Sequence, residues 1–327
     1  MRIAVDAMGG DNAPKALIEG ALAAANLDKS LDIILVGNKE ALPNENELPA
    51  NVTVEYSETI MEMDESVENL RKKKDSSIWV ATELVKSGRA DAIVSAGSTA
   101  AQMASALLLF SRIKGITRPA IGITFPTLQG GKIMLDVGAN VEVKSEQLVQ
   151  FAFMGDVYSK TLFGVKNPRI MLLSNGTEEG KGTDEIVEAH QLLKETNLNF
   201  IGNIEGRDLL KGDYDVVVTD GFTGNMVIKT TEGVATALFG LIKEELTANV
   251  TRKIGAALIK PGLKNIKKMM DYTEYGGAPL LGVNGVSIVC HGSSNSVAIQ
   301  NAIRVAKECV QAGFVQQIAE QIQNNNE

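Results

Sequence analysis

Short runs of β-branched and apolar residues alternate with longer segments of helical periodicity along most of this 327-residue chain. Strands separated by helices are typical of βαβ units, which build a largely parallel sheet with helices on both faces. The sequence therefore predicts an α/β fold in three layers, α/β/α. We expect one catalytic domain over residues 1–327, in which any division into two lobes falls near residue 120.

The boundaries of the expected elements follow from the change between period 2 and period 3.6. The expected strands are 3–6, 31–37, 52–56, 91–95, 120–125, 133–137, 169–173, 200–202, 215–219 and 286–289. The expected helices are about 14–27, 76–87, 98–111, 145–163, 183–195, 222–247 and 295–323.

Charge and cysteine content exclude several classes of protein. The formal net charge is -8, which argues against nucleic-acid binding because that needs a basic surface. Cys290 and Cys309 give neither a disulfide framework nor a zinc-ligand spacing. The first residues lack a basic segment followed by a long apolar run, and no run approaches the ~18 apolar residues of a membrane span. We expect a soluble cytoplasmic protein.

Glycines and small polar residues follow six of the predicted strands. The segments are 6–11, 95–99, 136–140, 174–182, 220–225 and 291–294. Loops after the carboxyl ends of parallel strands converge on one crevice, where ligands bind. Glycine admits a ligand close to the backbone, and helix N-termini attract anions. We expect these loops to form one anion-binding rim; the alternative for any single loop is a plain βα turn.

Two nucleotide-binding motifs are excluded by spacing. Segment 176–182 resembles a phosphate-binding Walker loop, but it is one residue short and has Gly182 where Ser or Thr should bind magnesium. No G-x-G-x-x-G follows the first strand. A classical nucleotide site is therefore not expected.

The loop sequences resemble those of the bacterial phosphate acyltransferases of phospholipid synthesis. The matching segments are DAMGGDNAP at 6–14, SAGSTAA at 95–101, RPA at 118–120, LDVGAN at 135–140, DGFTGN at 220–225, KTTEG at 229–233 and CHGSSN at 290–295. The chain departs from the family at 98–100, where it reads Ser-Thr-Ala instead of the usual Asn-Thr-Gly. Ser98 lacks the amide side chain of the family's asparagine, so we do not expect it to contact a ligand in the way that an asparagine could.

This resemblance implies a fold similar to isopropylmalate dehydrogenases and phosphotransacetylases. It implies transfer of a long-chain fatty acyl group from an acyl-carrier-protein thioester to inorganic phosphate, without a cofactor. It also implies a homodimer whose acyl phosphate product is used by a membrane glycerol-3-phosphate acyltransferase.

The implied reaction sets modest chemical demands. Phosphate is already an anionic nucleophile, and the leaving thiol has an ordinary pKa of ~8.5. The site must position both substrates and aim donors at the developing oxyanion. Our catalytic candidates are Lys181, Lys229, His291 and Asn225. The substrate-binding candidates are Asp6, Gly9, Gly10, Asp11, Gly97, Ser98, Thr99, Arg118, Gly138, Asn140, Asn175, Gly176, Gly182, Asp220, Gly221, Gly224, Gly292 and Ser293.

Each candidate also has a purely structural interpretation. Lys181 and Lys229 are alternatively solvated surface lysines, and His291 is alternatively a hydrogen-bonded loop residue. The loop acids are expected to cap helices and hold loops rather than to bind a metal. Cys290 precedes His291, but adjacent residues at a strand end point to opposite faces, so we expect a buried structural thiol.

Residues 252–270 contain six basic residues and no acid, in a chain that is acidic overall. Apolar residues recur at 3–4 residue spacing on both sides of Pro261-Gly262, which predicts two amphipathic helices joined there, a hairpin at about 246–270. Three roles remain open: packing against itself or a second subunit, contact with an anionic membrane, or docking of an acidic carrier protein. Our working hypothesis is peripheral membrane contact through Ile254, Leu258, Ile259, Lys260, Leu263 and Lys264.

Three other functions share parts of this pattern. One is a phosphotransacetylase that acts on a short acyl-CoA, and another is a dehydrogenase of the same fold. The third is a non-enzymatic adaptor that binds an acyl carrier or lipid through the hairpin. The six polar loops favour an enzyme.

Overall fold

The computed structural model describes the backbone of residues 1–270 and 276–325, with side chains described outside 267–275 and 326–327. Within these ranges one sheet of eleven strands has the order β3-β2-β1-β4-β11-β10-β5-β6-β9-β7-β8. The strands are β1 Arg2–Asp6, β2 Asp32–Gly37, β3 Val52–Tyr56, β4 Ala92–Ser95, β5 Ala120–Thr127, β6 Gly130–Leu135, β7 Ile170–Ser174, β8 Phe200–Glu205, β9 Val216–Val218, β10 Ala278–Leu281 and β11 Val286–Val289.

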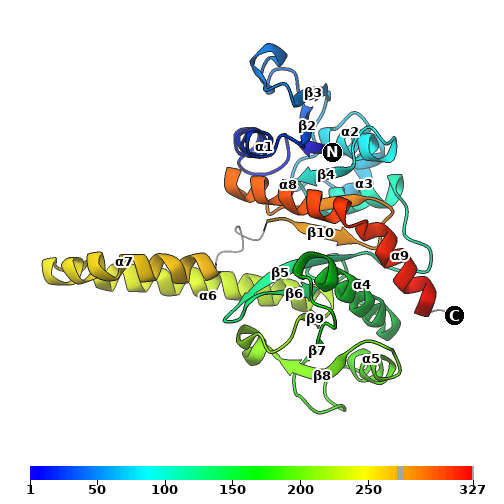
Figure 1. Cartoon of the computed structure of the whole chain (residues 1–327), viewed down its shortest axis with the longest axis vertical. Coiled ribbons are helices and arrows are strands. Elements are labelled where there is room, and N and C mark those ends of the chain that lie inside the picture. Colours follow the sequence, from blue (N-terminus) through cyan, green and yellow to red (C-terminus); the bar gives the residue numbers. More distant parts are fainter. Residues whose placement is uncertain (271–275, 326–327) are drawn as a thin grey trace.

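Helices cover both faces of this sheet, which confirms the predicted three layers (Figure 1). The first layer contains α1 Lys15–Leu27, α4 Ser145–Phe163, α5 Asp184–Lys194, α8 Ser296–Gln311 and α9 Phe314–Asn325. The second contains α2 Ser77–Lys86, α3 Thr99–Leu109 and the start of α6 Gly221–Thr247. Short 3-10 helices lie at η1 Glu45–Glu47, η2 Val67–Arg71 and η3 Gly206–Lys211. The continuous sheet runs past residue 120, and the lobe division stays a prediction.

The sheet is largely parallel but reverses direction near its centre. β10 pairs antiparallel with both β11 and β5, so β5 runs in the same direction as β11. β5 then pairs antiparallel with β6, and β9, β7 and β8 all run parallel to β6. The carboxyl ends of β1, β4 and β11 therefore lie at one edge of the sheet, which we call the first edge. Those of β6, β7 and β9 lie at the opposite edge, the second edge.

This reversal corrects the prediction of a single rim, because the six loops divide into two groups of three. The reversal arises at the β5–β6 hairpin, where Pro126 pairs with Gly131 and Thr127 with Gly130. Proline and glycine are poor strand formers, so the predicted β5 ended early, at residue 125, and the predicted β6 began late, at residue 133. The tight turn between them was therefore missed. The short β10 was missed altogether because Pro279 lies inside it.

The last predicted helix, 295–323, is two helices. Gly313 has a φ of +63° and separates α8 from α9. A left-handed glycine just after a helix is a common C-terminal stop. The expected buried stripe is present, since Ile299, Ile303 and Ala306 are buried and Phe314 continues it into α9.

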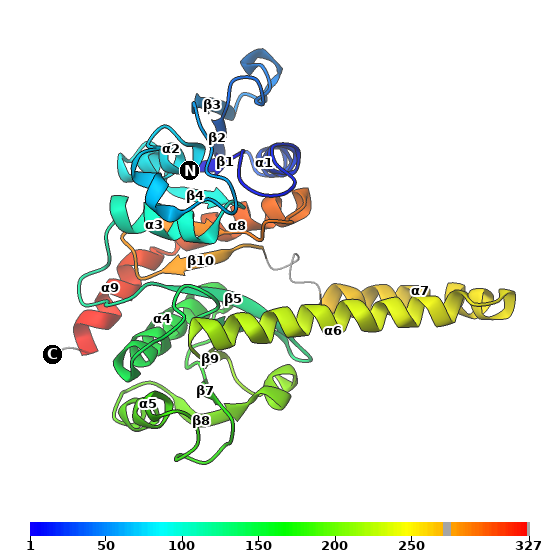
Figure 2. The same cartoon turned by 180° about the vertical axis from the view of Figure 1, so that it is seen from behind.

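The prediction of two helices joined at Pro261-Gly262 within about 246–270 is wrong, because one helix runs through these residues, although a longer helical hairpin is present. Its two helices are α6 and α7 Val250–Met270, and α7 continues through Pro261. The turn lies near Asn249, whose side-chain oxygen accepts a hydrogen bond of 2.9 Å from the Arg252 N–H. This cap starts α7, whereas Pro261-Gly262 was the stronger breaker signal in the sequence. The hairpin projects far from the sheet, as both views show (Figures 1 and 2).

None of the described helices is long and apolar enough to span a membrane.

Candidate active site

A cavity of about 370 Å³ lies between α6 and the ends of β4 and β11. Its head is formed by loops from the first edge of the sheet, which are tied together by backbone hydrogen bonds. The Asp11 N–H donates to the Gly292 carbonyl at 2.8 Å, and the Cys290 N–H donates to the Ser95 carbonyl at 2.8 Å. The cavity then extends beneath α6 along β5 and the start of β10.

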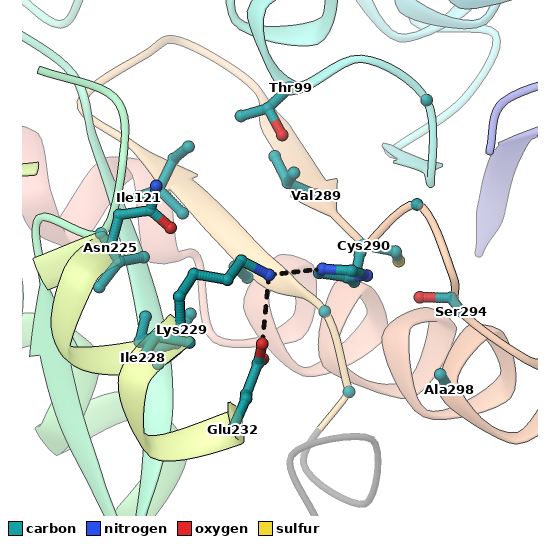
Figure 3. Close-up of a pocket in the computed structure, with 18 of the residues that line it drawn as sticks. Thr99, Ile121, Asn225, Ile228, Lys229, Glu232, Val289, Cys290, Ser294 and Ala298 are labelled. Atoms are coloured by element: carbon teal, nitrogen blue, oxygen red, sulfur yellow. Dashed lines mark hydrogen bonds and ion pairs between the residues drawn. The ribbon is translucent and has the colours of Figure 1, made fainter. Parts of the chain in front are cut away.

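One face of α6 supplies the polar side chains of the cavity wall. Asn225, Ile228, Lys229 and Glu232 recur at 3–4 residue spacing and therefore project from the same side of the helix. In Figure 3 Lys229 extends from α6 toward the end of the strand that carries Val289 and Cys290, and Glu232 points to its ammonium. Helix α6 begins at the second edge of the sheet and crosses the face, so its second and third turns meet the loops of the first edge.

Lys229 and His291 form the polar centre of the cavity. Lys229 Nζ lies 2.7 Å from His291 Nε2 and 3.2 Å from Glu232 Oε2. Because a lysine ammonium can only donate, His291 Nε2 accepts. Nδ1 faces Ser293, whose Oγ lies at 2.8 Å and whose backbone N–H donates to it at 3.2 Å. This chain of contacts joins α6 to the loop after β11.

Part of the cavity wall is apolar. It includes Ile121 and Ile123 from β5, Val137 from the loop after β6 and Ile228 from α6. Met63, half-exposed on the long segment between β3 and α2, lies against Gly292 at the head. The cavity therefore combines a charged head with a hydrophobic wall.

Two buried aspartates organise the loops without lining the cavity. Asp6 accepts hydrogen bonds from Ser95 Oγ at 2.7 Å and from the Met8 N–H at 3.2 Å. Burial raises the pKa of Asp6, and these hydrogen bonds oppose that effect. Asp6 thus joins the β1 and β4 loops, as predicted for the loop acids.

Asp136 has the same role at the second edge. Its carboxylate accepts from the N–H groups of Ile121, Ala139 and Asn140 at 3.0, 3.1 and 2.7 Å. Burial raises the pKa of Asp136 despite these bonds. The adjoining Asn140 carbonyl accepts from the Gly221 N–H at 2.7 Å. Asp136 therefore fixes the start of α6 and, through it, the position of Lys229.

Seven of the predicted site residues line the cavity: Asp11, Gly97, Thr99, Asn225, Lys229, His291 and Gly292. Gly9, Gly10 and Ser293 lie in the same loops without lining it. Ser98 and Asp220 are the N-caps of α3 and α6, because their side chains accept from Ala101 and Thr223.

The structure does not bring the other candidates into this cavity. Gly138, Asn140, Gly221 and Gly224 lie around Asp136 at the second edge, and Arg118 precedes β5 there. Asn140 is buried and donates to the Pro119 carbonyl at 2.7 Å, so its amide serves the loop.

Lys181, Asn175, Gly176 and Gly182 follow β7, which is separated from β5 by β6 and β9. Their loop is closed by its own contacts, with Ser174 Oγ donating to the Lys181 carbonyl at 2.9 Å. The prediction that Lys181 shares a site with Lys229 is wrong for this cavity, because β7 ends at the opposite edge of the sheet.

Sequence reasoning missed Glu232, Met63 and the apolar wall. Glu232 was detectable, because it lies three residues after Lys229 and seven after Asn225 on one helical face. Ile121, Ile123 and Ala278 had no such signal, since their place in the cavity depends on the antiparallel pairing of β5 with β10.

Cys290 is unsuited to act as a nucleophile. The residue is buried, and burial raises the pKa of its thiol to about 12. The thiolate is therefore scarce at neutral pH. No cluster of three or more potential metal ligands occurs among the side chains of residues 1–266 and 276–325.

Comparisons with known proteins identify the family. A sequence model described as "Fatty acid synthesis protein" matches residues 1–317. A phosphate acyltransferase of Desulfitobacterium hafniense (strain DSM 10664 / DCB-2) is 57% identical over 328 residues, covering 98% of this chain and 98% of the relative. A phosphate acyltransferase of Moorella thermoacetica is 51% identical and covers 96% of this chain and 94% of the relative.

Solved structures support the fold. The EutD phosphotransacetylase of Staphylococcus aureus has a TM-score of 0.57 at 17% identity, covering 95% of this chain and 94% of that one. A branched-chain phosphotransacylase of Enterococcus faecalis has a TM-score of 0.58 at 13% identity, covering 94% and 98%. Likeness at this identity concerns the fold alone. The sequence relatives confirm the resemblance stated above: the chain belongs to the phosphate acyltransferase family and is an acyltransferase.

Proposed function

We propose that this protein transfers a long-chain fatty acyl group from an acyl-carrier-protein thioester to inorganic phosphate, and that the acyl phosphate serves phospholipid synthesis. The observation that carries the proposal is the two-part cavity. Lys229, held by His291, offers an ammonium donor at its head, and Ile121, Ile123 and Ile228 form a hydrophobic wall. A ligand with an anionic group attached to an alkyl chain fits this division.

In the proposed reaction Lys229 holds phosphate near the thioester carbonyl. A phosphate oxygen forms a bond to the carbonyl carbon, and the π electrons move to the carbonyl oxygen. The carbonyl re-forms as the carbon–sulfur bond breaks, and the proton of HPO₄²⁻ passes to the leaving thiolate. The products are an acyl phosphate and a thiol, so atoms and charge balance. Asn225 and Lys229 are the donors proposed for the oxyanion.

The absence of a protein nucleophile in this scheme agrees with the state of Cys290. Its thiol is buried and protonated at neutral pH. His291 Nε2 is engaged by Lys229 at 2.7 Å, so it is not placed to take the Cys290 proton. Direct attack by phosphate is therefore favoured over an acyl-enzyme.

Mass-spectrometric detection of acyl phosphate from palmitoyl-carrier protein and phosphate tests the proposal. We expect product with the carrier-bound substrate and much less with acetyl-CoA. Lys229→Ala should reduce turnover, whereas Lys181→Ala, a matched change at the other edge of the sheet, should not. Preference for acetyl-CoA would indicate a short-chain phosphotransacetylase instead.

We further propose that the hairpin of α6 and α7 contacts an anionic membrane surface in the cytoplasm, where a lipophilic product can pass to a membrane glycerol-3-phosphate acyltransferase. Ile254, Leu258 and Ile259 are at least half exposed, and Leu258 reaches 80%. Lys260 and Lys264 are exposed beside them, whereas Leu263 is half-buried. Apolar side chains flanked by lysines favour an interfacial helix. The side chains of Lys267 and Lys268 lie outside the described residues.

Vesicle sedimentation tests this membrane proposal. The double variant Leu258→Glu, Ile259→Glu should lose binding to vesicles that contain anionic lipid while keeping acyl phosphate formation. Unchanged binding would contradict the proposal. Analytical ultracentrifugation of the same variant tests the proposed homodimer: a monomer would assign these side chains to the subunit interface instead.

A further inference from the structure

The cavity proposed to bind phosphate carries an unfavourable charge. Among the described residues that line it, the ionisable groups are Asp11, Lys229, Glu232, Cys290 and His291. The thiol is protonated and the imidazole accepts a hydrogen bond from the ammonium through Nε2, so two carboxylates face one ammonium. The formal side-chain charge is therefore -1, in a cavity that must accept an anion.

Glu232 has a defined relation to the single ammonium. It lies one turn after Lys229 on α6, its Oε2 is 3.2 Å from Lys229 Nζ, and its side chain is 26% exposed. His291 Nε2 accepts a second hydrogen bond from the same ammonium at 2.7 Å. Lysine has three N–H donors. In the described part of the chain, the third N–H is therefore left for a substrate oxygen.

We propose that Glu232 is a positioning residue that fixes the Lys229 ammonium against His291 and weakens phosphate binding before reaction. The inference rests on the proposed function, in which Lys229 binds phosphate. Without Glu232 the long lysine side chain gains rotamers, so its ammonium is less often aimed at the reacting atoms. The carboxylate also repels the phosphate dianion.

The two effects act on different kinetic constants. Binding energy that is realised equally in the ground state and the transition state does not raise kcat. A carboxylate that repels free phosphate raises its dissociation constant and avoids a tightly held ground state. As negative charge moves from phosphate onto the carbonyl oxygen and the sulfur, the electrostatic attraction between these atoms and the fixed Lys229 ammonium becomes stronger.

Isothermal titration with inorganic phosphate and steady-state acyl phosphate formation test the inference on the full chain. For Glu232→Gln we expect about tenfold tighter phosphate binding, equivalent to about 1.4 kcal/mol, together with about tenfold lower kcat. Glu232→Asp restores the charge with a shorter reach, so it should return phosphate affinity to the wild-type value and kcat only in part. Damage to the fold alone would lower kcat without tightening phosphate binding.

Glu244→Gln is the matched control, because it removes the same charge from the same helix about 18 Å along its axis. It should change neither constant. The inference is overturned if Glu232→Gln binds phosphate as weakly as the wild type or more weakly. Lys229→Ala distinguishes a failure of the proposed function from a failure of the inference about Glu232. If that variant keeps wild-type phosphate affinity, the proposed phosphate site itself is wrong.

Discussion

Substitution of Gly224 by alanine tests how tightly α6 is fixed against the loop of Asp136. A Cβ at Gly224 would lie 2.0 Å from the Asp136 carbonyl oxygen, a backbone atom that has little freedom to move. Gly233, nine residues later on the same helix, has no atom within 4 Å of an added Cβ. Comparing the same substitution at these two sites therefore isolates the contribution of packing to the free energy of unfolding.

The two substitutions should change the free energy of unfolding in opposite directions. Alanine replaces glycine in a helix interior with a gain of about 1 kcal/mol, which Gly233→Ala should show in full. At Gly224 the helix must retreat by about 1 Å, and overpacking of this kind costs up to about 3 kcal/mol. Gly224→Ala should therefore be about 2 kcal/mol less stable than the wild type. A displacement of this size at Lys229 should also reduce kcat by about 10²-fold.

Urea-induced unfolding followed by circular dichroism, combined with acyl phosphate formation, measures both quantities for each variant. Gly233→Ala should unfold at higher urea than the wild type and retain its turnover. If Gly224→Ala matches Gly233→Ala in unfolding free energy, or keeps wild-type turnover, then the contact with Asp136 does not fix the helix that carries Lys229.

Three further predictions follow from the same structure. Cys290→Ala should keep most activity, because its buried thiol has a pKa of about 12; loss of turnover in a folded variant would instead indicate an acyl-enzyme. Lys229→Ala should lower kcat/KM by at least tenfold while Lys181→Ala stays within twofold, and equal losses would place both lysines in one site. Burial opposes ionisation of Asp215, but hydrogen bonds from Arg169 lower its pKa to about 2. Its contribution to stability is then present above pH 4 and lost as the pH falls toward 2, so Asp215→Asn should flatten unfolding free energy against pH in that range.

The sequence was a sufficient guide to the layers, to most strands and to the chemistry of the loops. Helix 145–163 has the predicted bounds, and strands β3 and β11 agree residue by residue. These elements have strong local signals, with a regular period and clear ends. The ends of β5 and β6 were misjudged because Pro126 and Gly131 pair across a hairpin that no local preference favours.

Candidate residues were predicted better by type than by place. Lys229, His291 and Asn225 line one cavity, whereas Lys181 and Asn175 follow a strand that points the other way. Lys229 lies in the third turn of a helix that begins at such a loop, and the other four stand in or beside polar loops after strands, so the sequence offered no means to separate them. Glu232 was overlooked although it lies on the same helical face as Asn225 and Lys229.

By itself the sequence determined an α/β protein of the phosphate acyltransferase family, since alternating periods fix the elements and the loop motifs carry the family. Tertiary structure alone decided which loops meet. A strand's direction in the sheet depends on its hydrogen-bonded neighbour, and one hairpin between β5 and β6 inverts every strand beyond it. That inversion sends three polar loops to the far edge and leaves α6, crossing the sheet face, to bring Lys229 to His291.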